Sequence, residues 1–176
     1  MLGRKRKKAV KSTHKIIDKS NKNNHVDYQE VYRNIRTNIE YSAVGKNVKA
    51  INITSSISNE GKSTTALNLA MIYATKYANV LLIDADLRRP IQHHYLKLSN
   101  LRGLTNALIE YGETKKISSK YFQFIEDESF EGKLSVLTAG IKVPNPSELI
   151  SSDIFEEFIN DMPYLFVKSS VALNLS

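Results

Sequence analysis

The sequence contains no cysteine and no long apolar run, and each absence excludes a class of protein. Without cysteine there is no disulfide framework and no thiol chemistry, which suits a reducing cytoplasm. No apolar run approaches the roughly 20 residues of a membrane-spanning helix, and no apolar signal-peptide segment follows the basic N-terminus. With 176 residues, 41% hydrophobic and 24% charged, the chain is long enough for one globular domain with a real core.

Beyond its first residues, the chain also lacks an excess of positive charge. Residues 1–22 hold nine of the 25 Lys and Arg residues and one acid, Asp18, whereas the remainder holds 16 basic and 17 acidic residues. The body is therefore near neutral, which argues against a nucleic-acid-binding face. Residues 1–26 show no periodicity and are expected to be disordered, either as a solvated arm or as a polybasic segment on an anionic membrane surface.

A strand, a tight loop and a helix follow one another in the first half of the chain. Residues 50–54 are short and rich in β-branched side chains, as in a strand. Residues 62–77 carry apolar side chains at helical spacing. The loop between them ends in Gly-Lys-Ser-Thr at positions 61–64. This order is typical of a phosphate-binding loop, in which backbone N–H groups and a helix N-terminus surround a polyphosphate.

The loop motif predicts a role for several side chains. Lys62 is expected to reach the outer phosphates, and the Ser63 hydroxyl is expected to ligate Mg²⁺. The usual motif has a glycine where Ser56 stands, which is a mild departure because a small residue also fits a tight turn. The residues predicted to bind the nucleotide are Ser58, Asn59, Glu60, Gly61, Lys62, Ser63 and Thr64.

Two aspartates follow the next apolar strand. Residues 80–83 form a continuous apolar run, as expected for a strand buried on both faces of a parallel sheet. Asp84 and Asp86 come at its carboxyl end, on the same side because side chains alternate along a strand. Ligands bind at this edge of such sheets, so the acids and the phosphate loop should share a crevice that holds Mg²⁺. Arg88 and Arg89 could neutralise phosphate or tie the loop to those acids.

Apolar spacing and helix-start residues predict the other elements. Three helices are predicted: one that opens at Asp27 with Glu30 in a capping box, one over 103–109 broken at Gly112, and one over 146–160 capped by Asn145. Strands near a sheet edge are predicted over 121–125 and 134–137, and a further strand over 164–167. His93 and His94 have no third ligand at metal-site spacing and are interpreted as loop residues rather than a zinc site.

The first predicted helix carries Glu30, Arg33 and Arg36 broadly on one flank. Taken alone, these residues favour ordinary charge pairing on a surface helix. The alternative is a contact surface for another subunit, since arginine pairs directionally with carboxylates.

Together these motifs resemble those of the bacterial tyrosine kinases of capsular and exopolysaccharide operons, the CpsD/CapB family. The resemblance covers roughly residues 27–165. Residues 30–36 fit the E-x-x-R-x-x-R segment that packs subunits of this family into a ring, so the resemblance favours Glu30, Arg33 and Arg36 as an oligomer contact. The other matching segments are 58–64, 81–90, 103–108 and 144–150.

This resemblance implies a P-loop α/β fold of the MinD/ParA type, with a mostly parallel sheet flanked by helices. It implies transfer of the ATP γ-phosphoryl group to tyrosine, mostly on neighbouring copies, by positioning and charge neutralisation. Lys62 would hold the β- and γ-phosphates, Ser63 and Asp86 would support Mg²⁺, and Asp84 would orient or deprotonate the tyrosine hydroxyl. The implied activator is the cytoplasmic tail of a membrane polysaccharide co-polymerase, which puts the chain in the cytoplasm at the inner face of the plasma membrane.

Two parts of the family pattern are missing. Relatives carry a Walker B strand that ends in Asp-Thr-Pro-Pro, whereas residues 164–170 read Tyr-Leu-Phe-Val-Lys-Ser-Ser, and no tyrosine cluster follows Tyr164. We therefore expect a C-terminally incomplete kinase domain over residues 27–167 and a tail over 168–176 that is not family sequence.

Two other functions are considered beside the kinase. The first is an impaired, truncated remnant that only binds nucleotide or joins rings with intact subunits. The second is a partitioning-type ATPase of the same superfamily. It is disfavoured because such proteins carry an additional early lysine in the phosphate loop, and residues 56–58 offer none.

Overall fold

The computed structural model describes residues 10–11, 27–45, 49–55, 57, 60–162 and 165–171 of the chain. The prediction of disorder for residues 1–26 lies outside the described residues, apart from the two that form strand β1. Residues 172–176, the end of the predicted tail, lie outside them as well. Within the described part, no helix is both long enough and apolar enough to cross a bilayer.

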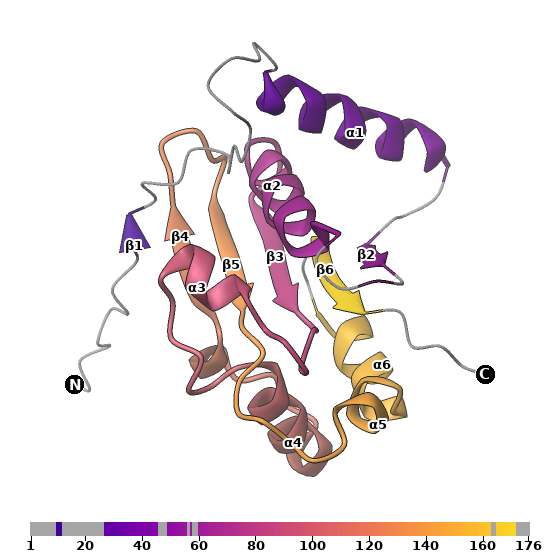
Figure 1. Cartoon of the computed structure of the whole chain (residues 1–176), viewed down its shortest axis with the longest axis vertical. Coiled ribbons are helices and arrows are strands. Elements are labelled where there is room, and N and C mark those ends of the chain that lie inside the picture. Colours follow the sequence, from indigo (N-terminus) through magenta and orange to yellow (C-terminus); the bar gives the residue numbers. More distant parts are fainter. Residues whose placement is uncertain are drawn as a thin grey trace.

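The described residues form six strands, six α-helices and one 3-10 helix (Figure 1). The strands are β1 (Val10–Lys11), β2 (Ala50–Ser55), β3 (Asn79–Asp84), β4 (Gln123–Glu126), β5 (Lys133–Leu137) and β6 (Leu165–Val171). The helices are α1 (Tyr28–Ser42), α2 (Lys62–Ala74), α3 (Gln92–Leu96), α4 (Leu104–Thr114), η1 (Ser119–Tyr121), α5 (Pro146–Ile150) and α6 (Asp153–Asn160).

The strands form one sheet in the order β1-β4-β5-β3-β6-β2. β4 runs antiparallel to β5, and every other pairing in this order is parallel. The sheet is therefore mixed but mostly parallel, which confirms the expected α/β fold. β2, β6 and β3 lie side by side and parallel, so their carboxyl ends meet at one edge of the sheet.

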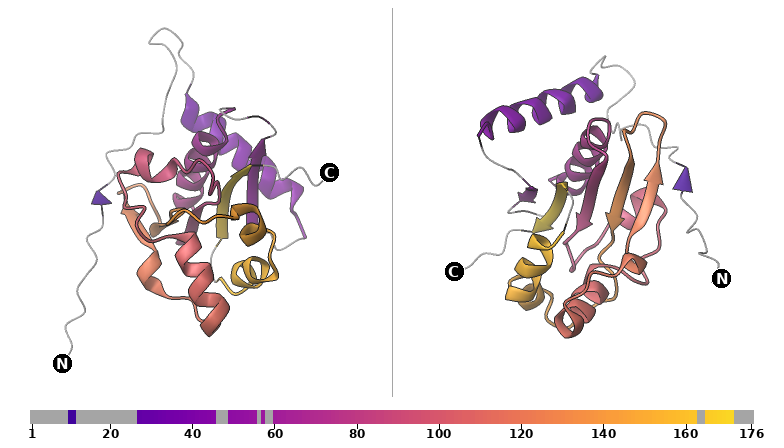
Figure 2. Two further views of the ribbon diagram at one scale, coloured as in Figure 1. Left: turned by 60° about the horizontal axis from the view of Figure 1, so that its bottom comes forward. Right: turned by 180° about the vertical axis from the view of Figure 1, so that it is seen from behind.

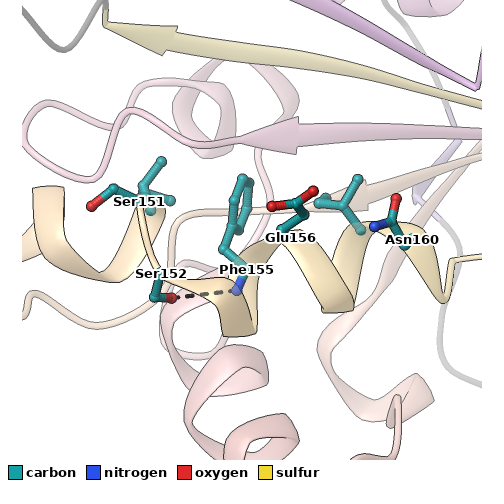
Figure 3. A pocket seen from close by; sticks show the side chains of 7 residues that line it. Ser151, Ser152, Phe155, Glu156 and Asn160 are labelled. Carbon is teal, nitrogen blue, oxygen red and sulfur yellow. Dashed lines mark hydrogen bonds between the residues drawn. The ribbon is translucent and has the colours of Figure 1, made fainter. Parts of the chain in front are cut away.

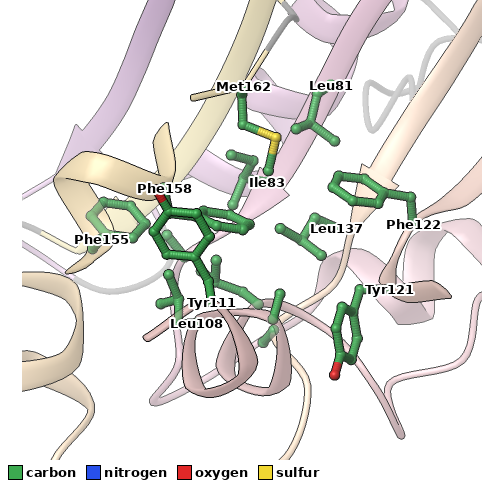
Figure 4. Close-up of a cluster of buried hydrophobic side chains, with 14 of the residues drawn as sticks. Leu81, Ile83, Leu108, Tyr111, Tyr121, Phe122, Leu137, Phe155, Phe158 and Met162 are labelled. Carbon is green, nitrogen blue, oxygen red and sulfur yellow. The ribbon is translucent and has the colours of Figure 1, made fainter. Parts of the chain in front are cut away.

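Side chains of β3 enter two hydrophobic clusters, one on each face of the sheet. Val80 and Leu82 belong to the cluster built with α2, against which α1 also packs. Leu81 and Ile83 belong to the cluster built with α4 and α6 (Figure 4). Figure 2 shows α1 running across the end of α2 and away from α4. Burial from both faces explains why this strand reads as a continuous apolar run.

β6 pairs with β3 on one side and with β2 on the other. Val167 is fully buried between them. The predicted strand over residues 164–167 is too short, because the strand ends at Val171. Residues 168–171 of the predicted tail therefore continue the central sheet and pair with β2.

His93 and His94 lie in α3, so their prediction as loop residues is wrong. The helix forms because the Asp84 carboxylate accepts hydrogen bonds from the backbone N–H groups of Ile91 and Gln92, at 3.1 and 3.0 Å. A carboxylate that accepts from the first N–H groups of a helix stabilises its start, as an N-cap does. This bond comes from a residue seven positions upstream, so no local signal predicts it.

α4 continues through Gly112, where the sequence predicts a break. A Cβ at Gly112 would lie 3.3 Å from Cδ1 of Ile154 in α6. The missing side chain therefore allows α4 and α6 to approach closely. The helix ends instead at Thr114, and Lys115 follows it in the left-handed region with φ 53°.

The predicted helix over residues 146–160 is two helices, α5 and α6. Ser152 separates them, because its hydroxyl accepts a hydrogen bond from the Phe155 backbone N–H at 3.3 Å and so begins a new helix. Asn145 stands at the start of α5, as predicted, but its side chain makes no capping bond and donates to Glu148 at 3.1 Å.

β5 lies inside the sheet, between β3 and β4, and its prediction as a strand near the edge is wrong. Residues 134–137 are all buried, since helices cover both faces and strands flank both sides. β4 is near the edge, with β1 beyond it.

Candidate nucleotide site

The predicted phosphate loop joins β2 to α2. Gly61 immediately precedes α2 with φ 82°, in the left-handed region that residues with a side chain rarely adopt. As the N-cap it offers no side-chain acceptor, so the first N–H groups of α2 can serve an anion at the positive end of the helix dipole. Of the residues predicted to bind nucleotide, Ser58 and Asn59, like the neighbouring Ser56, lie outside the described residues.

Lys62 and Asp86 meet at the carboxyl edge of the sheet. Lys62 Nζ lies 3.0 Å from Asp86 Oδ2, and the two side chains are only 10% and 4% exposed. Lys62 follows β2 and Asp86 follows β3, and both strands flank β6. Lys62 and Asp86 are expected to meet at this edge because the parallel strands β2 and β3 both end there.

Asp84 is fully buried, and both of its carboxylate oxygens accept backbone hydrogen bonds. Oδ2 accepts from Ile91 and Gln92, and Oδ1 accepts more weakly from the Asp86 N–H at 3.4 Å. Burial raises the pKa of Asp84 to about 6, and the N–H groups of Gln92 and Ile91 oppose that rise. Asp84 therefore holds the segment after β3 in place, and Oδ1 is its less engaged oxygen.

Gln92 links this segment to the phosphate loop, and the sequence prediction missed it. Its Nε2 donates to the backbone carbonyl of Ser63 at 2.8 Å, and the side chain is fully buried. Its Oε1 has no hydrogen-bond partner in the described part of the chain. Because its backbone N–H binds Asp84, Gln92 connects the aspartate to the first turn of α2. A single glutamine in a segment expected to be loop carries no signal for such a contact.

Arg88 and Arg89 are held by different groups. The Arg88 guanidinium donates to the Ser147 hydroxyl at 2.8 Å and so ties this segment to α5. Arg89 binds Asp86 through its backbone N–H at 3.0 Å, while its side chain is exposed. The loop is thus tied to Asp86 by main chain rather than by a guanidinium group.

Ser63 and Asp86 supply the oxygens expected for Mg²⁺. Both are buried, Ser63 in the first turn of α2 and Asp86 beside Lys62. Mg²⁺ in phosphate sites takes one or two carboxylates, with phosphate oxygens and water as its other ligands. Within the described ranges no three His, Cys, Asp or Glu side chains gather as a metal cluster. The residues present therefore fit a metal shared with phosphate better than a site made of protein ligands alone.

Arg36, one of the predicted oligomer residues, faces the body of its own chain. Its guanidinium donates to the Ile72 carbonyl at the end of α2, at 2.9 Å, and lies 3.7 Å from the Glu40 carboxylate. Glu40 also accepts from Lys76 at 2.7 Å and from the Tyr77 hydroxyl at 3.0 Å. Partial burial acts to raise the pKa of Glu40, but these hydrogen bonds and the charges of Lys76 and Arg36 outweigh it and lower that pKa.

Glu30 and Arg33 remain on the surface of α1. Both are exposed, and Arg33 donates only to Gln29 on its own helix, at 3.4 Å. Asp27 caps the helix as predicted, accepting from the N–H groups of Gln29 and Glu30. The three residues predicted to form one contact therefore divide into two exposed side chains and one that docks α1 on α2.

A separate hollow of about 360 Å³ lies beside α5 and α6 (Figure 3). It shares no residue with the predicted nucleotide site. Apolar and polar side chains line it in similar number, namely Ile150, Ser151, Ser152, Phe155, Glu156, Ile159 and Asn160.

A family model described as the CobQ/CobB/MinD/ParA nucleotide binding domain matches residues 51–161. This range contains the Lys62 loop, both aspartates and Gln92. Among curated proteins, the chain is 48% identical over 128 residues to the tyrosine-protein kinase YwqD of Bacillus subtilis, an alignment covering 73% of this chain and 51% of the relative. It is 38% identical over 142 residues to the putative tyrosine-protein kinase CapB of Staphylococcus aureus, covering 78% and 59%. The chain thus spans a little over half the length of these relatives.

Solved structures of bacterial kinase domains are also similar to this chain. The chimerical protein CapA2B2 superposes with a TM-score of 0.71 at 33% identity, covering 88% of this chain and 66% of that one. The VpsO kinase domain superposes with a TM-score of 0.65 at 31% identity, covering 84% and 72%.

Proposed function

The chain belongs to the bacterial tyrosine kinases, with a nucleotide-binding domain of the MinD/ParA type, and from this membership we propose that it transfers the γ-phosphoryl group of ATP to tyrosine. We place this activity in the control of capsular or exopolysaccharide synthesis. The observation that carries the proposal is the ion pair of 3.0 Å between Lys62 and Asp86 at the carboxyl edge of the sheet. It joins a phosphate-loop lysine to an acid suited to Mg²⁺.

In the proposed reaction, Lys62 leaves Asp86 for the β- and γ-phosphates of ATP. Asp86 is then free to support Mg²⁺ together with the Ser63 hydroxyl. Held by Ser63 and Asp86, Mg²⁺ would supply positive charge to offset the charge that develops on the transferred phosphoryl group. The N–H groups that follow Gly61 at the start of α2 face the phosphates, and Gln92 keeps that turn in place through the Ser63 carbonyl.

Asp84 is proposed to receive or orient the proton of the tyrosine hydroxyl. Oδ1 is the proposed atom, because Oδ2 already accepts two backbone hydrogen bonds. With a pKa of about 6, the carboxylate is mostly ionised at neutral pH and still basic enough to share a proton.

The proposed partners follow the family resemblance. We propose that the kinase domain, predicted over residues 27–167 and extended by β6 to Val171, is activated by the cytoplasmic tail of a membrane polysaccharide co-polymerase at the inner face of the plasma membrane. Self-association would use the α1 surface with Glu30 and Arg33. The basic residues of the N-terminal 22 would add attraction to anionic lipid, about 1 kcal/mol for each residue near the surface.

A phosphotyrosine blot tests the proposal. The purified chain is incubated with ATP, Mg²⁺ and the cytoplasmic tail of a membrane polysaccharide co-polymerase from the same organism. We expect a signal that Lys62→Ala abolishes and that Lys116→Ala, which removes an exposed lysine far along the chain, does not. ATP binding without any phosphotyrosine would overturn the kinase proposal and support a role limited to nucleotide binding or assembly.

A further inference from the structure

Tyr41 is the exposed tyrosine of the part of the chain that the structure describes. The chain has nine tyrosines, of which Tyr164 lies outside the described residues. The side chain of Tyr41, in the last turn of α1, is 73% exposed. The seven others are buried or half-buried, namely Tyr28, Tyr32, Tyr73, Tyr77, Tyr95, Tyr111 and Tyr121.

The hydroxyl groups of three of these tyrosines are also engaged in hydrogen bonds. Those of Tyr77, Tyr111 and Tyr121 donate to carboxylates elsewhere in the fold. The Tyr41 side chain makes no hydrogen bond or ring contact with the described residues. A tyrosine that accepts a phosphoryl group must enter the donor site with its oxygen in line with the bond that breaks. Tyr41 already projects into solvent, so its hydroxyl is accessible without loss of buried contacts.

The position of Tyr41 excludes transfer within one chain. Its neighbour Glu40 binds Lys76 and Tyr77, which follow the last residue of α2. Lys62 opens the same helix, and its 13 residues rise about 20 Å. In Figure 1, α1 lies at the end of the molecule opposite to that toward which β3 points. A tyrosine side chain is too short to span this separation, so the donor has to be another molecule.

We propose that Tyr41 is a phosphorylation site of this chain, and that a second copy of the chain is the donor. The proposal rests on the kinase function proposed above. The bond between the γ-phosphorus and the oxygen that bridges it to the β-phosphate breaks, and a bond from the γ-phosphorus to Tyr41 Oη forms. The phenolic proton passes to a base of the donor site, and ADP leaves.

A mixed reaction tests the proposal. A tagged Lys62→Ala chain, unable to donate, is incubated with the untagged chain, the co-polymerase tail, ATP and Mg²⁺, and its phosphotyrosine is mapped by mass spectrometry. We expect label on Tyr41 that is absent without the untagged chain. Adding Tyr41→Phe to the tagged chain should remove most of this label. Adding Tyr28→Phe, which changes a half-buried tyrosine of the same helix, should leave it.

A random copolymer of glutamate and tyrosine in the same mixture separates the two proposals. Phosphorylated copolymer, with label on other tyrosines and Tyr41 unmodified, would overturn the Tyr41 site and leave the kinase function standing. Copolymer and chain both unlabelled would overturn the kinase function, and the site with it.

Discussion

Lys62 and Asp86 are buried together, so loss of either partner leaves an unpaired charge away from water. We expect Asp86→Ala to lower the free energy of unfolding by about 3 kcal/mol. The double variant Lys62→Met with Asp86→Leu removes both charges and should recover much of that loss. Urea unfolding followed by circular dichroism measures both variants. A single variant as stable as the unchanged chain would contradict the ion pair.

Asp84 illustrates a residue whose charge costs stability. Its pKa is about 6 in the folded chain, mainly because of burial, against an ordinary value of 3.8. The stability that Asp84 contributes is therefore fully present below about pH 4, near its pKa in the unfolded chain. It is lost as the pH rises through about 6, its pKa in the folded chain. Asp84→Asn stays neutral throughout, so we expect its stability relative to the unchanged chain to increase between about pH 4 and pH 6.5. Tyrosine phosphorylation should be lost.

Thermal unfolding of the two proteins across that pH interval gives the difference directly. A difference in melting temperature that stays constant, or shrinks with rising pH, would argue against a raised pKa at Asp84. A relative stability that rises with pH, together with loss of activity, is the pattern expected of a residue kept for function.

Among the contacts that hold α1 on α2, the one made by Arg36 differs from that of the nearby Arg33. Arg36 donates to the Ile72 carbonyl, whereas the hydrogen bond of the Arg33 side chain within the described residues goes to Gln29 of its own helix. We expect Arg36→Ala to lower the free energy of unfolding by about 1.5–3 kcal/mol, since a charged hydrogen bond is lost. Arg33→Ala should change it by less than about 0.5 kcal/mol, as for most surface substitutions.

Sedimentation in the presence of ATP tests whether Arg33 contributes to self-association. Arg33→Ala should weaken self-association while its urea unfolding curve stays in place. If Arg33→Ala assembles like the unchanged chain, the proposed contact on α1 does not include this residue.

Phosphate on Tyr41 would also affect α1. It adds a charge of about −1.5 to −2 at the C-terminal end of a helix, where the dipole disfavours negative charge. The last turn of α1 has no basic residue to offset it. We therefore expect the phosphorylated chain to exchange the amide hydrogens of this turn faster than the unmodified chain, with Tyr41→Phe treated with ATP as control. Equal exchange would show that the turn tolerates the charge.

Across the whole molecule, the features that the sequence predicts correctly are those that a few neighbouring residues determine. Gly61 and Lys62 between a β-branched strand and an apolar helix predicted β2, the loop and α2. The apolar run before Asp84 predicted β3 and the edge at which the acid meets the loop, because parallel strands end together.

Long-range contacts account for what could not be predicted. The place of β5 inside the sheet and the path of β6 beyond Val167 depend on strand pairing between distant segments. Gln92 binds Ser63 across 29 positions, and Asp84 starts α3 from seven positions upstream. Gly112 lies in a helix at a point where Ile154 of α6 leaves little room for a side chain. In each case the deciding partner is too far along the chain for local patterning to indicate it.

The pairing of β6 with β2 leads to a prediction about which residues the folded unit needs. Residues 168–171 of β6 pair with residues 52–55 of β2, the part of β2 that leads into the phosphate loop. A chain ending at 167 keeps the buried Val167 but loses this pairing, so we expect it to fold with weaker binding of ATP and Mg²⁺ than a chain ending at 171. A chain ending at Met162 lacks β6, leaving β2 without its partner strand, and should not unfold cooperatively. Nucleotide titration and urea unfolding of the three chains distinguish these outcomes, and equal ATP affinity for the chains ending at 167 and 171 would show that the phosphate loop does not depend on the end of β6.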